Sequence, residues 1–327
     1  MPFSDSGLSA KQPLYLAPME DVTDPAFRLL CKRFGADRVY TEFVNADALV
    51  RDIPSTMRKL QIADAERPVA IQIYGKDVPS MVEAAKIVEQ AQPDFIDINF
   101  GCPVKKVASK GAGAGLLKDP PKMLAIAKAV VDAVHTPVTA KTRLGWSDDQ
   151  KIIVDLAEAL QDCGITELAI HGRTRAQMYT GQADWTLIGE VKNNPRMHIP
   201  VIGNGDVTTP ERAKECFDRY GVDAIMIGRA TFGNPWIFED IRRYLDGQEP
   251  LQRTLAWCMD ILKEHVLRSI EWIGDERKGI VHARRHFANA QVLKGLYDFK
   301  PLRIALLRAE SKDEVFAIMD QIVTQYS

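Results

Sequence analysis

FIDINFGCPVKKVASKGAGAGLLKD, residues 95–119, begins as a strand and ends where a helix starts. Polar residues alternate with apolar ones over residues 95–100, which places Asp97 and Asn99 on one face of a strand. Cys102 follows at once, and a segment rich in lysine and glycine comes after it. A lone cysteine is often a buried apolar filler, but the turn residues and lysines around Cys102 favour a functional thiol. The stretch predicts a strand that carries a thiol at its carboxyl end, under a flexible basic loop.

The same succession of apolar strand, loop and amphipathic helix recurs along most of the chain. The candidate strands are residues 14–18, 39–43, 69–74, 95–100, 138–143, 168–173, 201–205 and 224–229. Several of the following helices are predicted to open with a capping residue before a proline: Asp24 before Pro25, Asp119 before Pro120, Thr209 before Pro210 and Asn234 before Pro235. Eight such units in about 230 residues predict a (β/α)8 barrel. A doubly wound open sheet is the alternative, but no GxGxxG follows the first strand.

The strand pattern stops near residue 245, and helical patterns follow it. Apolar residues recur at helical spacing over residues 253–272, and Ser311 with Glu314 forms a predicted capping box that opens a last helix. The predicted fold class is therefore α/β, a (β/α)8 TIM barrel over residues 1–245 followed by a small all-helical C-terminal domain over residues 246–327.

Composition narrows the class of protein. The 327 residues include 26% charged and 46% hydrophobic residues, and the formal net charge is -2. These values are ordinary for a globular protein, so any nucleic-acid contact must come from a local patch. Residues 1–13 contain no apolar signal region, and no run approaches ~18 apolar residues, so no membrane span is expected. The cysteines show no CxxC pair or metal-ligand spacing, which predicts reduced thiols, no metal site and a cytoplasmic location: Cys31, Cys102, Cys163, Cys216 and Cys258.

Strand alternation predicts which side chains face the barrel interior. A polar set shares the inner face of four adjacent strands: Gln72 and Tyr74, Asp97 and Asn99, Thr139, Lys141 and Arg143, and His171 and Arg173. Active sites of this fold lie at the carboxyl ends of the strands. A buried ammonium must be paired, so Lys141 is expected either to pair with Asp97 in an internal salt bridge or to face a bound group.

The last two strands end in glycines and charged residues. Asn204, Gly205 and Asp206 follow one of them, and Gly228 with Arg229 follows the next. Loops after strands seven and eight of this fold commonly bind phosphate, and an arginine there adds a charged donor. The glycines could also be plain tight turns. Together with the inward polar set, the pattern favours a flavin with a phosphate tail, FMN.

A set of short motifs makes the chain resemble a known family. The motifs are LAPM at 16–19, VTD at 22–24, DIN at 97–99, GCP at 101–103, GAGAGLL at 111–117, KTR at 141–143, HGRTR at 171–175, NGD at 204–206 and IGR at 227–229. Together they resemble the tRNA-dihydrouridine synthases, most closely the bacterial B-type enzymes. The resemblance spans the whole barrel. It implies an FMN enzyme that uses NADPH to reduce selected uridines in tRNA.

The resemblance also implies roles for individual residues. The flavin would contact Pro18, Met19, Gln72, Lys141 and His171, and its phosphate tail would contact Asn204, Gly205, Asp206, Gly228 and Arg229. The substrate would contact Asn99, Arg143, Arg173 and Arg175, with Cys102 as the general acid. Glu20 and Asp21 depart from the family pattern, which usually has smaller residues after Pro-Met.

The chemistry of the reaction supports an acid role for Cys102. Reduction of the uracil C5–C6 double bond requires a hydride at C6 and a proton at C5. A thiol with an ordinary pKa of ~8.5 is mostly protonated at neutral pH, whereas a nucleophilic cysteine would need a lowered pKa. Lys141 could stabilise the negative charge of the reduced ring, and His171 could do the same if charged.

Basic residues cluster in the predicted helical domain. Between Arg277 and Arg308 the only acidic residue is Asp298. The basic residues are Arg277, Lys278, Arg284, Arg285, Lys294, Lys300, Arg303 and Arg308. A solvated helix face is the alternative, but in a slightly acidic chain this excess favours a patch for the tRNA backbone. We expect charge reversal of Arg284 and Arg285 to weaken tRNA binding.

Three other functions remain open from the sequence. One is an FMN barrel acting on a small molecule, such as a dihydroorotate dehydrogenase, with Cys102 as a base; it leaves Arg173, Arg175 and the basic domain unexplained. Another is a barrel for phosphorylated sugars with Lys141 as a Schiff-base lysine, and the third is an RNA-binding protein with an inactive barrel. Flavin absorbance would separate the flavin enzymes from the last two. A monomer is expected, and no motif indicates which uridine is modified.

Overall fold

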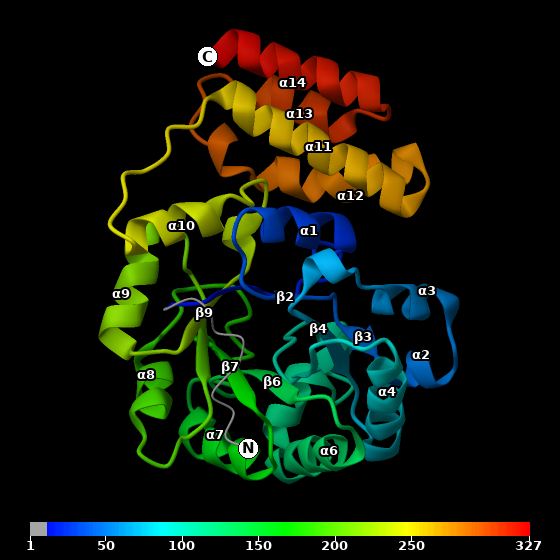
Figure 1. The fold of residues 1–327 in the computed structure, drawn as a ribbon, viewed down its shortest axis with the longest axis vertical. Coiled ribbons are helices and arrows are strands. Elements are labelled where there is room, and N and C mark those ends of the chain that lie inside the picture. The colour runs from blue at the N-terminus through cyan, green and yellow to red at the C-terminus, as the bar shows by residue number, and fades with distance from the viewer. Residues whose placement is uncertain (1–11) are drawn as a thin grey trace.

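A closed parallel barrel forms the larger part of the computed structural model, which describes residues 12–327 (Figure 1). Its strands are β1 (Leu14–Leu16), β2 (Val39–Tyr40), β3 (Val44–Asn45), β4 (Val69–Tyr74), β5 (Phe95–Asn99), β6 (Val138–Arg143), β7 (Glu167–His171), β8 (Val201–Asn204) and β9 (Ala224–Ile227). They pair in the order β1-β9-β8-β7-β6-β5-β4-β2, with the short β3 also beside β4. A parallel bridge between Tyr15 and Arg38 closes the ring. The predicted TIM barrel is confirmed, and each of the eight predicted strands is present with ends within three residues of the prediction.

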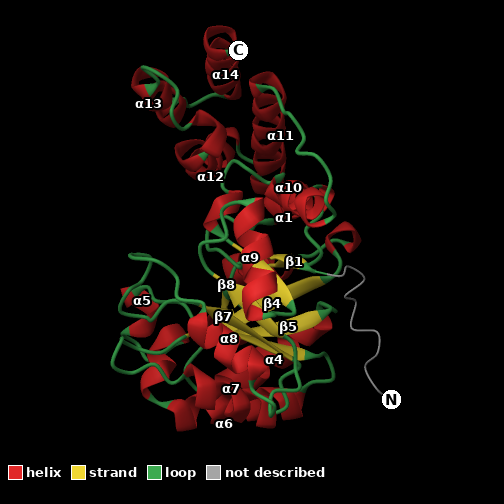
Figure 2. Ribbon diagram, turned by 90° about the vertical axis from the view of Figure 1, so that its left-hand side faces the viewer, coloured by secondary structure: helices red, strands yellow, loops and turns green. Residues whose placement is uncertain are grey.

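Helices surround this ring and connect its strands (Figure 2). They are α1 (Pro25–Arg33), α2 (Ala46–Val50), α3 (Pro54–Met57), α4 (Val78–Gln90), α5 (Lys105–Ala108), α6 (Pro120–Ala133), α7 (Ile153–Asp162), α8 (Thr186–Asn193), α9 (Pro210–Tyr220) and α10 (Ile237–Leu245). The predicted caps Asp24, Asp119 and Thr209 each accept a hydrogen bond from a first-turn backbone N–H.

The fourth predicted helix start is wrong by a short distance. Helix α10 begins at Ile237, two residues after Pro235, and Asn234 is not its cap. The Asn234 side chain instead donates to the carbonyl of Ala230, 3.2 Å away, and so closes the preceding turn. A capping residue can bond to the backbone on either side of it, and here the earlier turn takes the contact.

The amino-terminal end of the barrel is filled by side chains. Arg38 donates to Glu167 at 2.6 and 3.0 Å, and both residues are buried. The guanidinium of Arg38 also lies 3.7 Å from the ring centroid of Phe95 and 4.6 Å from that of Tyr15. A buried ion pair of this geometry, with two hydrogen bonds, compensates its own desolvation. The barrel is therefore packed at this end and open toward the carboxyl ends of its strands.

The basic segment after β5 is more ordered in structure than the predicted flexible loop. It folds into α5 and a 3-10 helix, Gly113–Lys118, and most of that 3-10 helix is buried. A Cβ at Gly115 would lie 2.4 Å from the carbonyl oxygen of Ala108, so glycine is required for this close contact. The glycines here permit tight packing, whereas the sequence pattern predicted mobility.

Four helices complete the chain and lie beyond the barrel, next to α1 and α10 (Figures 1 and 2). They are α11 (Leu255–Ile273), α12 (Glu276–Asn289), α13 (Lys300–Arg308) and α14 (Lys312–Tyr326). The predicted capping box of Ser311 and Glu314 opens α14. Helix α11 packs on α1, and Arg33 pairs with Glu264 at 2.7 Å across that contact. The helical C-terminal region is thus present and docked on the barrel.

Within residues 12–327, none of the helices combines the length and apolar character needed to cross a bilayer. The prediction that residues 1–13 carry no signal region falls almost wholly on residues 1–11, which lie outside the described part of the chain. The predicted boundary at residue 245 coincides with the end of α10 and stays a prediction.

Candidate active site

A cavity of about 1120 Å³ opens at the carboxyl ends of the strands. Most of the predicted site residues line it: Pro18, Met19, Asn99, Cys102, Lys141, Arg143, His171, Asn204, Gly205, Asp206, Gly228, Arg229 and Arg285. Four predicted residues do not: Gln72, Arg173, Arg175 and Arg284. Because these residues come from β5, β6, β7 and β8, from the loops that follow β1, β8 and β9, and from α12, the fold gathers them from distant parts of the sequence.

Cys102 lies at the lip of β5, with 7% of its surface exposed. The Asn99 side-chain oxygen accepts hydrogen bonds from the backbone N–H groups of Gly101 and Cys102, at 3.0 and 2.8 Å. This turn directs the thiol into the cavity between Val107 and Ala112. Burial raises the pKa of the Cys102 thiol above its ordinary value, so the group carries its proton at neutral pH.

Lys141 has no carboxylate partner among the described residues. No ion pair joins it to Asp97, whose side chain instead accepts from Thr139 and Gln72, each at 2.5 Å. Burial lowers the pKa of Lys141 to about 8, with Arg143 contributing, and burial raises the pKa of Asp97 to about 6. Of the two possibilities drawn from the sequence, the internal salt bridge is absent, and the ammonium faces the cavity.

Gln72 lies beneath the cavity and not on its wall. Its side chain is fully buried, donates to Asp97 and accepts from Asn99 at 2.8 Å. All three belong to adjacent strands β4 and β5, and the network fixes the orientation of Asn99. In this arrangement Gln72 supports Asn99, and its predicted contact with the flavin ring stays a prediction.

Arg143 is a buried guanidinium whose hydrogen-bond partners are backbone carbonyls. It donates to Gly101 at 2.8 Å, Thr174 at 3.0 Å and Met178 at 2.8 Å. Burial lowers the pKa of Arg143 to about 10, which leaves it charged at neutral pH. Together with Lys141 it makes the inner cavity strongly electropositive, as expected of a site for an anionic group.

His171 and Arg173 form a second polar cluster on the far wall. Arg173 lies 3.2 Å from the Nε2 atom of His171 and donates to Asp206 at 2.6 Å, so it is buried behind the wall and does not line the cavity. Burial, together with the nearby cations Arg143, Lys141 and Arg173, lowers the pKa of His171 well below its ordinary value. His171 is neutral, and the charged form considered from the sequence is disfavoured.

The corner predicted to hold a phosphate lies at the carboxyl ends of β8 and β9, and its ligand stays a prediction. Asn204 donates from its side chain to the carbonyl of Met226 at 2.7 Å, which joins β8 to β9. Gly205 has a φ of 123°, and a Cβ there would meet Ala183 at 2.7 Å, so only glycine fits. Arg229 is half exposed, and its contact with Asp206 is long, at 3.3 Å. Its guanidinium is therefore accessible to an anion.

Several lining residues were not identified from the sequence. Tyr179 lies under two guanidinium groups, 5.6 Å from Arg143 and 5.3 Å from Arg229. Others are Phe43, Asn45, Asn289 and Gln291. Tyr179 follows the HGRTR motif closely, which is the one signal that could have pointed to it. Phe43, Asn45, Asn289 and Gln291 belong to none of the motifs singled out in the sequence.

Two of the predicted substrate residues lie away from the cavity. Arg175 stacks on Trp146, with 4.7 Å between its guanidinium and the ring centroid. Arg284 donates to the carbonyl of Ala309 at 2.9 Å, within the helical region. Their contacts with a substrate stay predictions, because neither residue lines the cavity.

One group of carboxylates could in principle hold a metal ion. The oxygens of Glu20, Asp21 and Glu42 lie within 4.8 Å of one another. The ammonium of Lys59, however, lies 2.6 Å from Glu20 and 3.7 Å from Glu42. It supplies the positive charge that these carboxylates need.

Comparison with known proteins identifies the class to which this fold and site belong. The family model for dihydrouridine synthase (Dus) matches residues 15–325, so the chain belongs to the dihydrouridine synthase family and is an oxidoreductase. It is 44% identical to tRNA-dihydrouridine synthase B of Pseudomonas putida over 275 residues, which cover 84% of this chain and 80% of that protein. It is 38% identical to the protein of the same name from Vibrio vulnificus over 313 residues, with 94% and 96% coverage.

Solved structures with the same barrel are more distant. An old yellow enzyme homologue of Zymomonas mobilis superposes with a TM-score of 0.52 at 14% identity, covering 76% of this chain and 92% of that chain. Morphinone reductase in complex with tetrahydroNAD gives 0.52 at 13% identity, with 75% and 89% coverage. These similarities concern the fold alone.

Proposed function

We propose that the protein is an FMN-dependent tRNA-dihydrouridine synthase that uses NADPH to reduce the C5–C6 double bond of selected uridines in tRNA. Membership of the dihydrouridine synthase family supports this class of reaction. The observation that carries this proposal is that one cavity wall holds both a protonated thiol, Cys102, and an ammonium without a carboxylate partner in the described part of the chain, Lys141.

The donors of the cavity fit FMN. Lys141 would bind the ring edge, Pro18 and Met19 would lie against the ring, and Arg229 with the glycines after β8 and β9 would bind the phosphate. When bound and reduced, the flavin supplies a hydride. The unpaired charges of Lys141 and Arg143 favour an anionic guest, because a buried cation without a counter-charge is costly.

Cys102 is assigned the role of general acid toward C5 while hydride is delivered to C6. Its raised pKa keeps the proton on sulfur until the carbon becomes basic. Asn99 and Arg143 form the same wall and are proposed to orient the uracil. A base for an oxidation would need the opposite shift in the thiol pKa, which disfavours the dihydroorotate-type rival.

The Schiff-base rival also loses support. A lowered lysine pKa, such as that of Lys141, would suit a Schiff-base lysine. The family match, however, assigns the chain to oxidoreductases, and a lysine that only formed a Schiff base would leave the adjacent protonated thiol without a role.

A uridine within folded tRNA must be swung out of its stack to enter the cavity, at a cost of a few kcal/mol. Lysines at the rim can offset this cost through phosphate contacts: Lys106 and Lys110 from the barrel side and Lys294 from the helical side. We further propose that the protein acts as a monomer in the cytoplasm, a compartment suited to its five unpaired cysteines.

Replacing Cys102 tests the mechanism. Cys102→Ala should retain bound FMN and its reduction by NADPH but lose at least ~10²-fold in the rate of dihydrouridine formation, because the proton donor is gone. Stopped-flow flavin absorbance measures the two half-reactions separately. Cys163→Ala is the control, since that thiol lies outside the cavity and donates to the carbonyl of Leu124. Undiminished uridine reduction by Cys102→Ala would remove the thiol from the mechanism.

The substrate class has its own test. The purified protein should be yellow, and tRNA from a strain lacking the gene should lack dihydrouridine at the positions that the protein restores in vitro. A colourless protein that cannot be loaded with FMN would overturn the proposal.

A further inference from the structure

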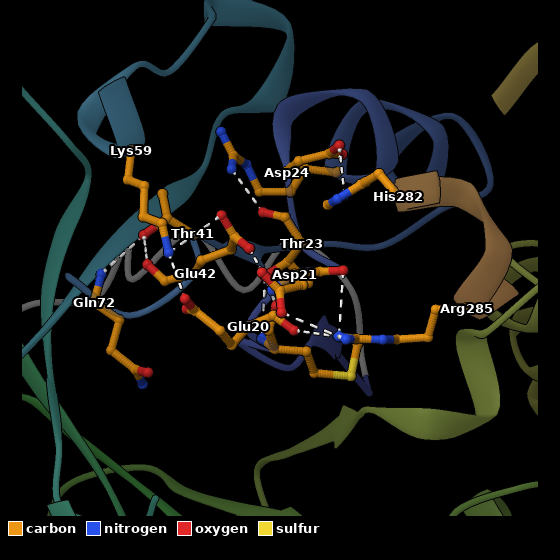
Figure 3. A network of polar contacts seen from close by, with 12 residues as sticks. Glu20, Asp21, Thr23, Asp24, Thr41, Glu42, Lys59, Gln72, His282 and Arg285 are labelled. Atoms are coloured by element: carbon orange, nitrogen blue, oxygen red, sulfur yellow. Dashed lines mark hydrogen bonds and ion pairs between the residues drawn. The ribbon is translucent and has the colours of Figure 1, made fainter. Parts of the chain in front are cut away.

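One face of α12, although it belongs to the helical region, contacts the loops that form the cavity. The Nε2 atom of His282 lies 3.0 Å from Oδ2 of Asp24, which caps α1. Arg285 donates to the carbonyl of Glu20 at 2.7 Å and reaches the Asp21 carboxylate at 3.4 Å (Figure 3). These two side chains are three residues apart, so they lie on the same side of the helix.

The loop that they contact runs from the end of β1 to the start of α1. It carries Pro18 and Met19 into the cavity. At Asp21 its backbone has a φ of 55°, a left-handed conformation that is uncommon for a residue other than glycine. Such a conformation persists only where surrounding contacts hold it.

Contacts from the opposite side hold the same loop. The backbone N–H of Asp21 donates to Glu42 at 2.5 Å, and Lys59 donates to Glu20 at 2.6 Å (Figure 3). Glu42 and Lys59 belong to the barrel, whereas Arg285 belongs to α12. The loop is therefore held between the two regions of the protein.

Helix α12 also reaches the loop that follows the neighbouring strand. His286 accepts a hydrogen bond from the backbone N–H of Gly233 at 3.3 Å, and this glycine follows the 3-10 turn that begins at Arg229. Strands β1 and β9 are neighbours in the barrel. One helix thus contacts the loop on the ring side and the loop on the phosphate side of the proposed cofactor.

We propose that Arg285 and His282 are positioning residues through which docking of the helical region shapes the β1–α1 loop for the cofactor. Docking of α12 and flavin binding then form one linked equilibrium, in which each strengthens the other by the same factor. This inference rests on the proposed function. It gives Arg285 a role in the cavity that is distinct from a contact with the tRNA backbone.

Substitution of Arg285 in the full-length protein tests the linkage. Arg285→Ala should raise the Kd for FMN about 3- to 10-fold, because a charged hydrogen bond to the loop is removed. It should also speed amide hydrogen exchange in residues 17–23 of the flavin-free protein. Arg285→Lys keeps one charged donor and should recover part of both effects. His282→Gln, which breaks the contact with Asp24, should act in the same direction.

Arg277→Ala is the matched control. Arg277 lies on the same helix but pairs with Glu310 inside the helical region, at 2.9 Å, so both readouts should match those of the unmodified protein. Circular dichroism verifies that each variant is folded.

The outcomes separate this inference from the proposed function. A wild-type protein that binds no flavin would overturn the proposed function, whereas loop exchange would still report whether Arg285 holds the loop. Flavin binding with the same Kd in wild type and Arg285→Ala would overturn the inference alone. If Arg285→Ala lowered the salt dependence of tRNA binding but left the Kd for FMN unchanged, Arg285 would be assigned to the RNA backbone, and the inference would also be overturned.

Discussion

Two cationic side chains, Lys141 and Arg143, determine which ligands the cavity favours. Arg143 is buried and Lys141 is half-buried, and neither cation has a carboxylate partner in the described part of the chain. Asp97, on the strand next to both, is engaged with the neutral groups of Thr139 and Gln72. An apolar or neutral guest would leave both charges uncompensated. The site is therefore built to gain most from a ligand that is anionic or becomes anionic during the reaction.

Lys141→Met tests this at the residue scale. Removing the ammonium should weaken FMN binding and slow uridine reduction about 10²-fold, because charge on the reduced ring is no longer stabilised. Flavin affinity in the wild-type protein should fall as pH rises through about 8, the pKa at which free Lys141 loses its proton, and Lys141→Met should abolish this step.

Fluorescence titration of FMN between about pH 7 and pH 9 gives both results. Lys118→Met serves as control, since that lysine is exposed and lies 4.0 Å from the ring centroid of Trp146, away from the cavity. An FMN affinity of wild type that does not change over this pH range would contradict the role given to the ammonium.

At the scale of elements, the contact between α1, α11 and α12 contains a cluster of aromatic rings and histidines. His265 lies 5.2 Å from Phe27 and 4.3 Å from His286, measured between ring centroids. Both ring nitrogens of His265 are buried without a hydrogen-bond partner within residues 12–327. Burial lowers the pKa of His265 to about 4. The carboxylates of Asp24 and Glu264 raise this pKa, but only in part, because His282 and Arg268 lower it further.

This cluster should make the contact between the two regions sensitive to acid. The folded-state pKa of His265 is below its unfolded value, so the unfolded chain takes up a proton first and stability falls between about pH 6.5 and pH 4. His265→Leu should reduce that loss by ~3 kcal/mol at pH 4. His282 acts in the opposite sense: although burial lowers its pKa, the contact with Asp24 raises it overall, so its contribution is lost at higher pH.

Urea unfolding at about pH 7 and pH 4 measures the difference. His198→Gln is the control, because that histidine is exposed, and its variant should show the pH response of wild type. An equal loss of stability in His265→Leu and wild type would exclude His265 as the cause.

The strands and helices could be predicted from the sequence better than the side-chain contacts between them. The alternation in 95–100 and the repeated strand pattern were enough to predict the barrel and its inward polar set, because side-chain direction follows strand parity. The glycines of residues 111–117 led to the prediction of a flexible loop, because the sequence alone does not distinguish a glycine needed for close packing from one in a mobile loop. Gln72 and Arg285 could not be placed, because their hydrogen-bond partners lie far away in the chain.

At the scale of the whole molecule, the predicted basic patch for the tRNA backbone stays a prediction. Arg277, Arg284 and Arg285 of the predicted patch bond within the protein. Exposed lysines remain on both sides of the cavity mouth, Lys106 and Lys110 on one and Lys294 on the other. A tRNA that inserts a nucleotide would meet positive charge on each side of the opening.

The affinity for tRNA should therefore fall steeply with salt. Lys110→Glu or Lys294→Glu should weaken binding and lower the slope of log K against log salt by about one for each phosphate that the variant no longer neutralises. Filter binding between about 50 and 200 mM salt gives the slope. Lys86→Glu on α4 is the control, because Lys86 is exposed, lies 4.0 Å from Glu83 and does not line the cavity. A flat salt response would contradict binding of RNA at the mouth.

The ion pair of Arg38 and Glu167 closes the amino-terminal end of the barrel, and Phe95 and Tyr15 pack against Arg38. A ligand can therefore reach Lys141 only through the opening of the cavity, which residues of α5 and α12 line. If the proposed function holds, NADPH and the tRNA nucleotide would reach the site through the same opening, and one would have to leave before the other could bind.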